Sequence, residues 1–396
     1  MTKSNENKAG YKHTSIGRIP VDWEVKPLSA YFRLASGKTK PTELKANPIP
    51  PFIYPVYGGN GILGFSKEHI AHGTRIVIGR VGENCGVTIL IEDRYWITDN
   101  ALYSTQIEKS VDPAFLVYKL QQEDLSRLRN KGGQPLISQK PIYNKIVAMP
   151  SLPEQLAIVS ILSTWDSAIE KVQQLIAQKE LQKKALMQQL LTGKKRLKGF
   201  SEKWRNCHIG EIASELVLKN GDHNQLVVLS CTKYEGLVPS LEYFGRKMYG
   251  DDLSTYKVVP RNTFAYATNH IEEGSIGYQR NYAQALISPM YTVFKTNGAT
   301  NDEYLYRLLK SHKYVHEYRK RMEGSINRRG GLRWEEFSKI KLVLPAIKEQ
   351  DAINDVLTTA DKELELLNQK LQLLKEQKRG LMQKLLTGEV RVQVKK

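Results

Sequence analysis

The sequence predicts an α+β protein in which two globular mixed α/β domains are separated by two long helices. These helices are expected to form an antiparallel coiled coil and to give the chain a pseudo-twofold symmetry axis. Three observations lead to this prediction. The 396 residues exceed what a single hydrophobic core usually covers. One helical segment occurs twice, and the stretches before each copy are domain-sized and rich in Gly, aromatic and β-branched residues.

The repeat defines the domain organisation. Residues 150–197 and 345–392 align without a gap at an offset of 195, and 20 of 48 positions are identical. The clearest match is LMQQLLTGKKR against LMQKLLTGEVR. Such a match indicates a duplicated unit. The predicted domains are a first globule, a central helix, a second globule and a C-terminal helix, at residues 1–149, 150–199, 200–344 and 345–396.

Both copies carry a heptad pattern, which predicts a coiled-coil seam. Lys183 and Lys378 interrupt the seam at equivalent places, where a polar residue can fix the register. Ser151 and Glu154 have the spacing of a capping box at the first helix start. The predicted apolar seam consists of Ile158, Leu162, Trp165, Ile169, Val172, Ile176, Leu186, Leu190, Ile353, Leu357, Leu364, Leu367, Leu371, Leu374, Leu381 and Leu385.

The two globules share small features. Each begins near a tryptophan, Trp23 or Trp204, and each has a basic residue and two glycines shortly before its helix, at 131–133 and 329–331. The net charge is +18, with 20 basic and 13 acidic residues in 1–149 and 21 and 16 in 200–344. This spread of positive charge favours an anionic partner for both globules, nucleic acid being the commonest.

Composition also narrows the protein class. The three cysteines are far apart, which argues against a disulfide scaffold or a cysteine-rich zinc site and fits a reducing cytoplasm. No apolar run approaches the length of a membrane span, and the first residues do not resemble a signal peptide. We therefore expect a cytoplasmic protein.

Motifs for catalysis are incomplete. Residues 59–64 match GxGxxG, but the prolines before them do not suit a buried strand. The GKT at 37–39 lacks the earlier glycine of a phosphate loop, because Phe32 stands there. Ile49 replaces the polar residue of the amino-methyltransferase tetrapeptide, and Lys313 replaces the glutamate that a zinc-protease helix needs after His312. No catalytic residue and no metal ligand is predicted.

The residues resemble the specificity (S) subunit of type I restriction-modification systems over nearly the whole chain. That family alternates two target-recognition domains with two repeated helical regions. The matching stretches are LPEQ (152–155), LLTG (190–193 and 385–388), YPVYGGNGILGFS (54–66), IGRVGENCGVTILIEDRYWITDNALY (78–103), YKVVPRNTFAYATNHIEEGSIGY (256–278) and SPMYTVF (288–294).

The resemblance implies a non-catalytic DNA-binding subunit. Each recognition domain would read one half of a split site in double-stranded DNA, and the coiled coil would set the spacer and dock two modification (methyltransferase) subunits. S-adenosylmethionine would be on those adenine-specific partners. ATP and Mg would be on restriction (translocase-nuclease) subunits, where these are present. No cofactor is expected on this chain.

Basic and amide side chains in glycine-flanked loops are the candidates for DNA contact, because they can reach phosphates and base edges. For each of them, a solvated charge or a turn residue is the plainer interpretation. The candidates are Lys38, Lys40, Arg80, Lys131 and Gln134 in the first domain and Lys233, Arg246, Lys247, Asn269, Arg280, Asn281, Arg328 and Arg329 in the second.

Two other functions stay open on the sequence. A stand-alone DNA methyltransferase or nuclease would need a cofactor motif that is not found here. A structural coiled-coil DNA-binding protein would not need two large, positively charged globules. The DNA target, the spacer length and the presence of a restriction subunit do not follow from the sequence.

Overall fold

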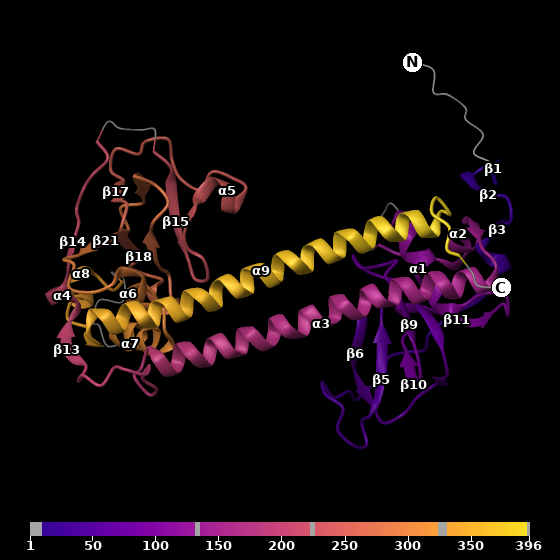
Figure 1. Cartoon of the computed structure of the whole chain (residues 1–396), viewed down its shortest axis with the longest axis horizontal. Helices are drawn as coiled ribbons and strands as arrows, with labels where there is room; N and C mark the ends of the chain where they lie inside the picture. Colours follow the sequence, from indigo (N-terminus) through magenta and orange to yellow (C-terminus); the bar gives the residue numbers. More distant parts are fainter. Residues whose placement is uncertain (1–9, 131–134, 222–225, 324–330, 394–396) are drawn as a thin grey trace, which may run out of the picture. The chain divides into compact units, whose positions relative to one another are not determined.

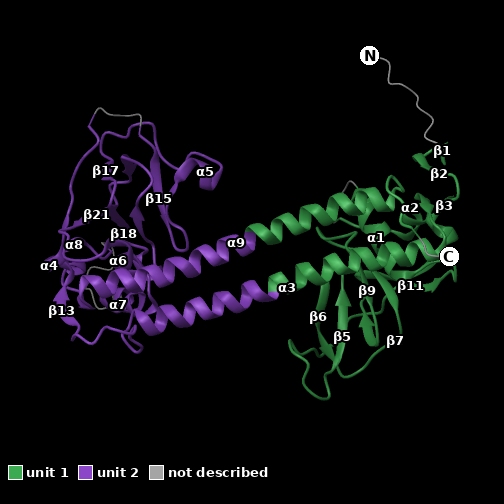
Figure 2. Ribbon diagram, in the orientation of Figure 1, with its two compact units in different colours: residues 1–173, 369–396 green, residues 174–368 purple. Residues whose placement is uncertain are grey.

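The computed structural model describes residues 10–130, 135–221, 226–323 and 331–393. The chain divides into two compact units, residues 1–173 with 369–396 (unit 1) and residues 174–368 (unit 2) (Figures 1 and 2). The predicted boundaries follow the chain, whereas each unit groups one globular domain with parts of both long helices. The predicted fold class, two mixed α/β domains with two long helices, is confirmed.

Unit 1 is built on two four-stranded sheets. The first has the order β6 (Gly61–Ser66), β5 (Tyr54–Gly58), β10 (Arg94–Ile97), β7 (Ala71–His72), and β5 and β10 are parallel. The second has the order β4 (Phe32–Ser36), β11 (Ala101–Ile107), β8 (Arg75–Gly79), β9 (Thr88–Ile91), and all its pairs are antiparallel. Two ladders complete the unit, β1 (Tyr11–Thr14) with β2 (Gly17–Pro20) and β3 (Glu24–Pro27) with β12 (Ile146–Met149).

Short helices connect these strands. They are η1 (Leu28–Ala30), α1 (Pro113–Gln122), η2 (Leu125–Leu128) and α2 (Gln139–Tyr143). The start of α1 is fixed by sequence: the Asp112 carboxylate accepts a hydrogen bond from the Phe115 N–H at 2.8 Å, and Pro113 occupies the first helical position.

Unit 2 has the same plan. Its first sheet has the order β16 (Gly236–Pro239), β15 (Val228–Thr232), β20 (Gln284–Ile287), β17 (Lys257–Pro260), and β15 and β20 are parallel. Its second sheet has the order β14 (Ala213–Glu215), β21 (Tyr291–Thr296), β18 (Thr263–Ala267), β19 (Ile276–Gln279). A ladder joins β13 (Arg205–His208) to β22 (Lys341–Leu344). The helices are α4 (Ile209–Ile212), α5 (Ser240–Phe244), η3 (Ile271–Glu273), α6 (Asp302–Leu309), α7 (His312–Glu323) and α8 (Trp334–Phe337).

Apart from β1 and β2, which have no equivalent among the described residues of unit 2, the strands of the two units correspond one by one. The parallel pair β5 and β10 in unit 1 matches β15 and β20 in unit 2, and the antiparallel sheet has the same order in both. Helix α6 matches α1, because the Asn301 side chain caps α6 by accepting from Tyr304 N–H at 2.8 Å, as Asp112 caps α1. The duplication therefore extends through the globules, although their sequences differ.

The two long helices are α3 (Leu152–Leu190) and α9 (Ile347–Leu386). Each begins in one unit and ends in the other, and each is followed by a glycine with positive φ, Gly193 (70°) or Gly388 (72°), which is a typical helix stop. Every predicted seam residue is buried or partly buried. Leu366 and Leu373, which lie off the seam, are 64% and 57% exposed.

Each unit has one main core that includes helix ends from both repeats. In unit 1, Ile158 and Leu162 of α3 pack with Leu385 and Leu386 of α9 under the α1 face. In unit 2, Leu190 and the adjacent Leu191 pack with Ile353 and Leu357. Within each unit the start of one helix thus lies beside the end of the other, which is the antiparallel arrangement that was predicted. No helix of the described residues is long and apolar enough to cross a membrane.

Candidate nucleic-acid interface

In unit 1, loops from several strands converge beside the segment that follows residues 131–134. Lys38 N–H donates to Ile97 O at 2.9 Å, and Arg80 N–H donates to Asn100 O at 3.0 Å. Ile137 N–H donates in turn to Arg80 O at 2.9 Å. A Cβ at Gly79 would collide with the carbonyl oxygen of Gly59, so this close approach of two loops requires glycine.

Three predicted cations lie on these loops. Lys38 and Lys40 are exposed, and within the described residues neither ammonium group has a hydrogen-bond or ion-pair partner. Arg80 is half-buried, donates from Nη1 to Ser36 Oγ at 3.0 Å and keeps a buried Nε without a partner among the described residues. Unit 1 therefore presents unneutralised positive charge on loops of fixed backbone. Lys131 and Gln134 lie outside the described residues.

The equivalent loops of unit 2 meet around Asn269. Leu332 N–H donates to Thr268 O at 2.8 Å, as Ile137 does to Arg80, and a Cβ at Gly331 would collide with Thr268 O. Asn269 lines a cavity of about 530 Å³ together with Met290, Arg333 and Trp334. Arg328 and Arg329 lie outside the described residues, immediately before this segment.

The remaining candidates of unit 2 are dispersed. Lys233 lies at the β15–β16 turn, with its Nζ 5.3 Å from the centre of the Tyr234 ring. Arg280 pairs with Glu303 of α6 at 2.8 Å, so a DNA contact would have to replace this ion pair. Lys247 pairs with Asp251, and Arg246 has no ion-pair partner in the part of the chain that the structure describes. Asn281 N–H donates to Gln279 Oε1 at 2.7 Å, and its position is that of a turn residue.

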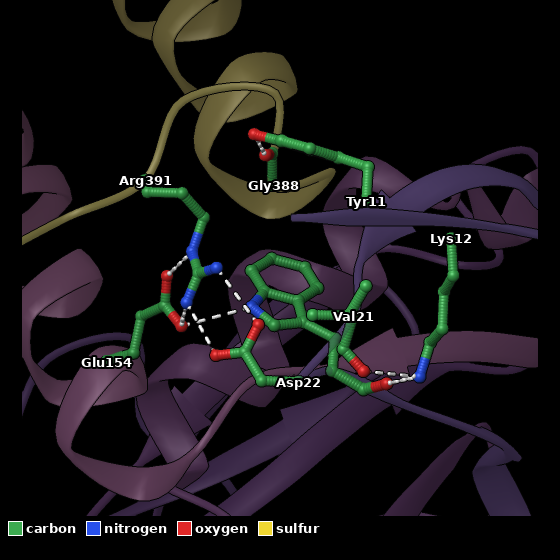
Figure 3. Close-up of polar contacts among 8 residues, drawn as sticks. Tyr11, Lys12, Val21, Asp22, Glu154, Gly388 and Arg391 are labelled. Carbon is green, nitrogen blue, oxygen red and sulfur yellow. Dashed lines mark hydrogen bonds and ion pairs between the residues drawn. The ribbon is translucent and has the colours of Figure 1, made fainter. Parts of the chain in front are cut away.

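In each unit a buried polar cluster, which we call the clamp, joins the start of one long helix to the segment that follows the other. In unit 1 the Glu154 carboxylate, 2% exposed, accepts from Trp23 Nε1 at 3.0 Å and from Arg391 Nε at 2.7 Å. The Arg391 guanidinium also binds both carboxylate oxygens of Asp22, at 2.9 and 2.7 Å, and it lies between the two acids (Figure 3). Hydrogen bonds from Arg391 lower the pKa of Asp22.

The same clamp recurs in unit 2 at the repeat offset. Glu349, 1% exposed, accepts from Trp204 Nε1 at 3.2 Å and from Arg196 Nε and Nη2 at 2.5 and 2.6 Å. Glu154 and Glu349 are repeat equivalents, as are Arg196 and Arg391. Each arginine comes from the end of one repeat and meets the glutamate at the start of the other, so the clamp joins the two copies in each unit.

The glutamine beside each glutamate positions the domain helix. Gln155 Oε1 accepts from the backbone N–H of Asp112, the cap of α1, at 2.8 Å. Gln350 Oε1 accepts from the N–H of Asn301, the cap of α6, at 2.9 Å. In each repeat, therefore, the glutamate binds the tryptophan at the start of the globular domain, and the adjacent glutamine binds the residue that caps α1 or α6.

The lysines that interrupt the seam form reciprocal ion pairs. Lys378 Nζ lies 2.5 Å from Asp166 Oδ1, and Lys183 pairs with Asp361, the repeat equivalent of Asp166. A third group joins each pair at matching positions: Tyr118 Oη donates to Asp166 at 2.6 Å, and Arg307 lies 2.7 Å from Asp361. The lysines therefore bind the facing helix rather than extending into solvent.

Two features of this site were missed from the sequence. The capping box predicted for Glu154 is wrong, since its carboxylate binds Trp23 and Arg391 instead. The clamp was therefore missed. Its signal in the sequence was the offset of 195, which separates Glu154 from Glu349 and also Arg196 from Arg391. Arg333 was also missed; it follows the Gly-Gly pair at 330–331 and has no charged partner among the described residues.

Comparison with known proteins identifies the family. The sequence model of the "Type I restriction modification DNA specificity domain" matches residues 20–181 and 247–376. The chain belongs to this family. It is a type I specificity subunit with two target-recognition domains, and its role in DNA recognition is non-catalytic.

Relatives cover nearly the whole chain. The type I restriction enzyme MjaVIII specificity subunit of Methanocaldococcus jannaschii is 26% identical over 95% of this chain and 94% of its own. A putative MjaX specificity subunit of the same organism is 24% identical over 96% and 97%. The crystal structure of the S subunit from M. genitalium covers 98% of this chain and 99% of its own, with a TM-score of 0.59 at 15% identity, and this likeness concerns the fold.

Proposed function

We propose that each recognition domain of this specificity subunit reads one half of a bipartite DNA site. The observation that supports it most directly is the repeated clamp. The chain thus holds two copies of one structural frame, made of the clamp and the ends of α3 and α9, and the recognition loops of the two copies differ. Unit 1 offers Lys38, Lys40 and Arg80, and unit 2 offers Asn269 and Arg333 beside a cavity. Two copies of one frame with unlike loops fit an asymmetric site with two half-sites.

The helical frame would serve the partners. We propose that α3 and α9 set the spacer between the half-sites and dock two methyltransferase subunits, which would supply S-adenosylmethionine. Restriction subunits, where present, would supply ATP-dependent cleavage. A solved structure that explains complex assembly of the type I restriction-modification system resembles this chain with a TM-score of 0.58, and assembly of that protein supports the proposal.

Methylome sequencing tests the proposal. Hosts with and without this gene, both carrying the modification gene, are compared for methylated adenines. We expect a bipartite, asymmetric motif that is present only with the gene. A methylated motif that is identical in both hosts, or a continuous palindrome, would contradict the assignment of half-sites to this chain.

Variants then assign half-sites to units. Lys38→Ala with Lys40→Ala should relax only the first half-site, and Asn269→Ala with Arg333→Ala only the second, because each pair belongs to one unit. Lys109→Ala, an exposed lysine away from the converging loops, is the matched control. If either double variant relaxed both halves equally, one domain for one half-site would be wrong.

A further inference from the structure

Unit 2 contains a segment without a counterpart in unit 1. Strands β6 and β7 are joined by residues 67–70, whereas their equivalents β16 and β17 are joined by residues 240–256. The flanking strands pair in the same order in both units, so the extra length is an insertion into a shared topology. We call residues 240–256 the α5 segment.

The base of the α5 segment is held in a fixed place. Ser240 is 1% exposed and accepts a hydrogen bond from Ser230 Oγ at 3.0 Å. Leu253 is buried against Val228 and Leu286, and its carbonyl accepts from Asn220 Nδ2 at 3.2 Å. The segment is therefore anchored at both ends on the first sheet, and its tip has a defined position in the unit.

The tip presents apolar side chains to solvent. Leu241, Tyr243, Phe244 and Met248 are 52%, 45%, 44% and 52% exposed. Tyr243 and Phe244 pack edge to face with ring centres 5.0 Å apart. Scattered exposed apolar residues are ordinary, but four large ones within eight positions of one anchored segment form a patch, and such patches mark binding surfaces.

The charges around the patch leave one cation available. Lys247 is paired with Asp251 and lies 5.4 Å from the centre of the Tyr249 ring. Asp252 accepts from the Ser254 N–H at 2.9 Å. Arg246 and Glu242 are exposed, and Arg246 has no ion-pair partner among the described residues.

The patch is continuous with the candidate interface of unit 2. Met248 and Tyr249 line a cavity of about 280 Å³ together with Asn269 and Met290. Asn269 and Met290 also line the larger cavity beside Arg333. The α5 segment thus forms one wall of the surface to which the proposed function assigns the second half-site.

We propose that the α5 segment contacts the bases of the second half-site through its apolar side chains, with Arg246 on a phosphate. This inference rests on the proposed function. Two like methyltransferase subunits would meet surfaces that the repeat provides twice, whereas the half-site is the ligand that differs between the units. An element present in unit 2 and absent from unit 1 therefore fits DNA better than a partner subunit.

The chemistry restricts what the segment recognises. Phe244, Leu241 and Met248 offer no hydrogen bonds, so they can recognise only apolar parts of DNA. These are the 5-methyl group of thymine and the faces of unstacked bases. A phosphate contact by Arg246 would fix the depth of the segment in the groove without adding sequence information.

The test uses the chain assembled with its modification subunits and duplexes that carry the site defined by methylome sequencing. Phe244→Ala with Met248→Ala should weaken binding of that site by about tenfold, the scale of one mismatched base pair. Discrimination should fall in the second half-site only, and the melting temperature should not change because both side chains are already exposed. Ile16→Ala with Ile146→Ala, which removes similarly exposed apolar groups in unit 1, should leave binding unchanged.

Modified DNA separates the two kinds of base contact. Deoxyuridine in place of thymidine tests contact with methyl groups, and 2-aminopurine fluorescence reports unstacking of bases. In the wild type, either the substitution must lower the affinity or binding must raise the fluorescence. The double variant must lose that effect. Unchanged DNA affinity of the Phe244/Met248 variant would overturn the inference. Loss of the modification subunits from that variant on size exclusion would also overturn it, by showing a protein-docking patch. If the wild type itself showed no bipartite preference, the proposed function would fail instead.

Discussion

Replacing Arg391 by Met tests whether the repeated clamp stabilises the frame. Arg391 neutralises Glu154, which is 2% exposed, and also binds Asp22. Methionine keeps most of the side-chain length and removes the charge. The Glu154 carboxylate would then keep only the Trp23 indole N–H as the partner seen in the structure.

The expected cost follows from the burial of the acid. Breaking a buried ion pair by removing one partner costs about 3–5 kcal/mol, because an uncompensated charge is left in a dry place. The Arg391 side chain is 38% exposed, so water reaches the pair from one side and the lower end, about 3 kcal/mol, applies. For a unit of this size each kcal/mol lowers the melting temperature by roughly 2–4 °C, so unit 1 should melt roughly 6–12 °C earlier.

Calorimetry combined with hydrogen exchange locates the effect. We expect faster exchange in α9 peptides near Leu385 and in the first turns of α3, while α9 peptides near Ile353 in unit 2 stay protected. Arg379→Met is the matched control, since Arg379 is an exposed arginine of α9, the helix that precedes Arg391, and has no ion pair in the described residues. Arg391→Met combined with Glu154→Gln should regain part of the loss, because the buried charge is gone and the amide oxygen still accepts from Trp23.

Two results would show that Arg391 does not stabilise unit 1 through the clamp. If Arg391→Met melted like Arg379→Met and exchanged like the wild type, the clamp would contribute nothing to unit 1. Equal destabilisation of unit 1 and unit 2 would also contradict it, because Arg391 contacts residues of unit 1 alone.

Three further outcomes are expected. DNA affinity should fall with salt at a slope of log K against log salt near −5 if about six phosphates are neutralised, and a slope near zero would contradict a cationic interface. Deleting the matched heptads 169–175 and 364–370 keeps the seam in phase and shortens each helix by about 10 Å. The preferred DNA spacer should then shorten by up to roughly three base pairs, which selection from a pool of randomised spacer lengths measures. The purified chain should give no calorimetric heat with S-adenosylmethionine, and micromolar binding would contradict the assignment of that cofactor to partner subunits.

The sequence predicted what periodicity and duplication control. The heptad seam, from Ile158 to Leu385, depends on spacing along one chain, and the structure places each of its positions in a buried or partly buried location. The tryptophans that begin the globules were visible as a shared feature. That Trp23 and Trp204 donate to equivalent buried glutamates was not, because a hydrogen bond between residues 131 or 145 positions apart leaves no local pattern.

The interface was predicted only in part for the same reason. Lys38 and Arg80 were chosen one by one for their charge and their glycine neighbours, but their convergence depends on the pairing of β4, β8 and β11, which one sequence does not specify. Arg280 was chosen on the same grounds, and its pairing with Glu303 depends on how α6 packs. The α5 segment is recognisable as an insertion only after the strands of the two units are matched.

Unit 2 should lose stability at acid pH because Asp361 becomes protonated. Burial alone would raise the pKa of Asp361, but hydrogen bonds from Lys183 and Arg307 outweigh burial and hold the pKa below its ordinary value of 3.8. A carboxyl whose folded-state pKa is lowered stabilises the fold fully above the unfolded pKa, and this stabilisation is lost as the pH falls through the folded value.

The free energy of unfolding of unit 2 should therefore differ between wild type and Asp361→Asn by a constant amount from pH 7 to about pH 4.5, and this difference should shrink below about pH 4. This difference is measured by denaturant unfolding, with hydrogen exchange of α6 peptides as the readout because α6 carries Arg307. Asp355→Asn, at an exposed position of the same helix, should differ little from wild type at any pH. Because other carboxyls titrate in the same range, the comparison of the two variants is what isolates Asp361. A difference that stayed constant down to pH 3 would show that the Lys183–Asp361–Arg307 cluster does not couple the seam to the recognition domain through charge.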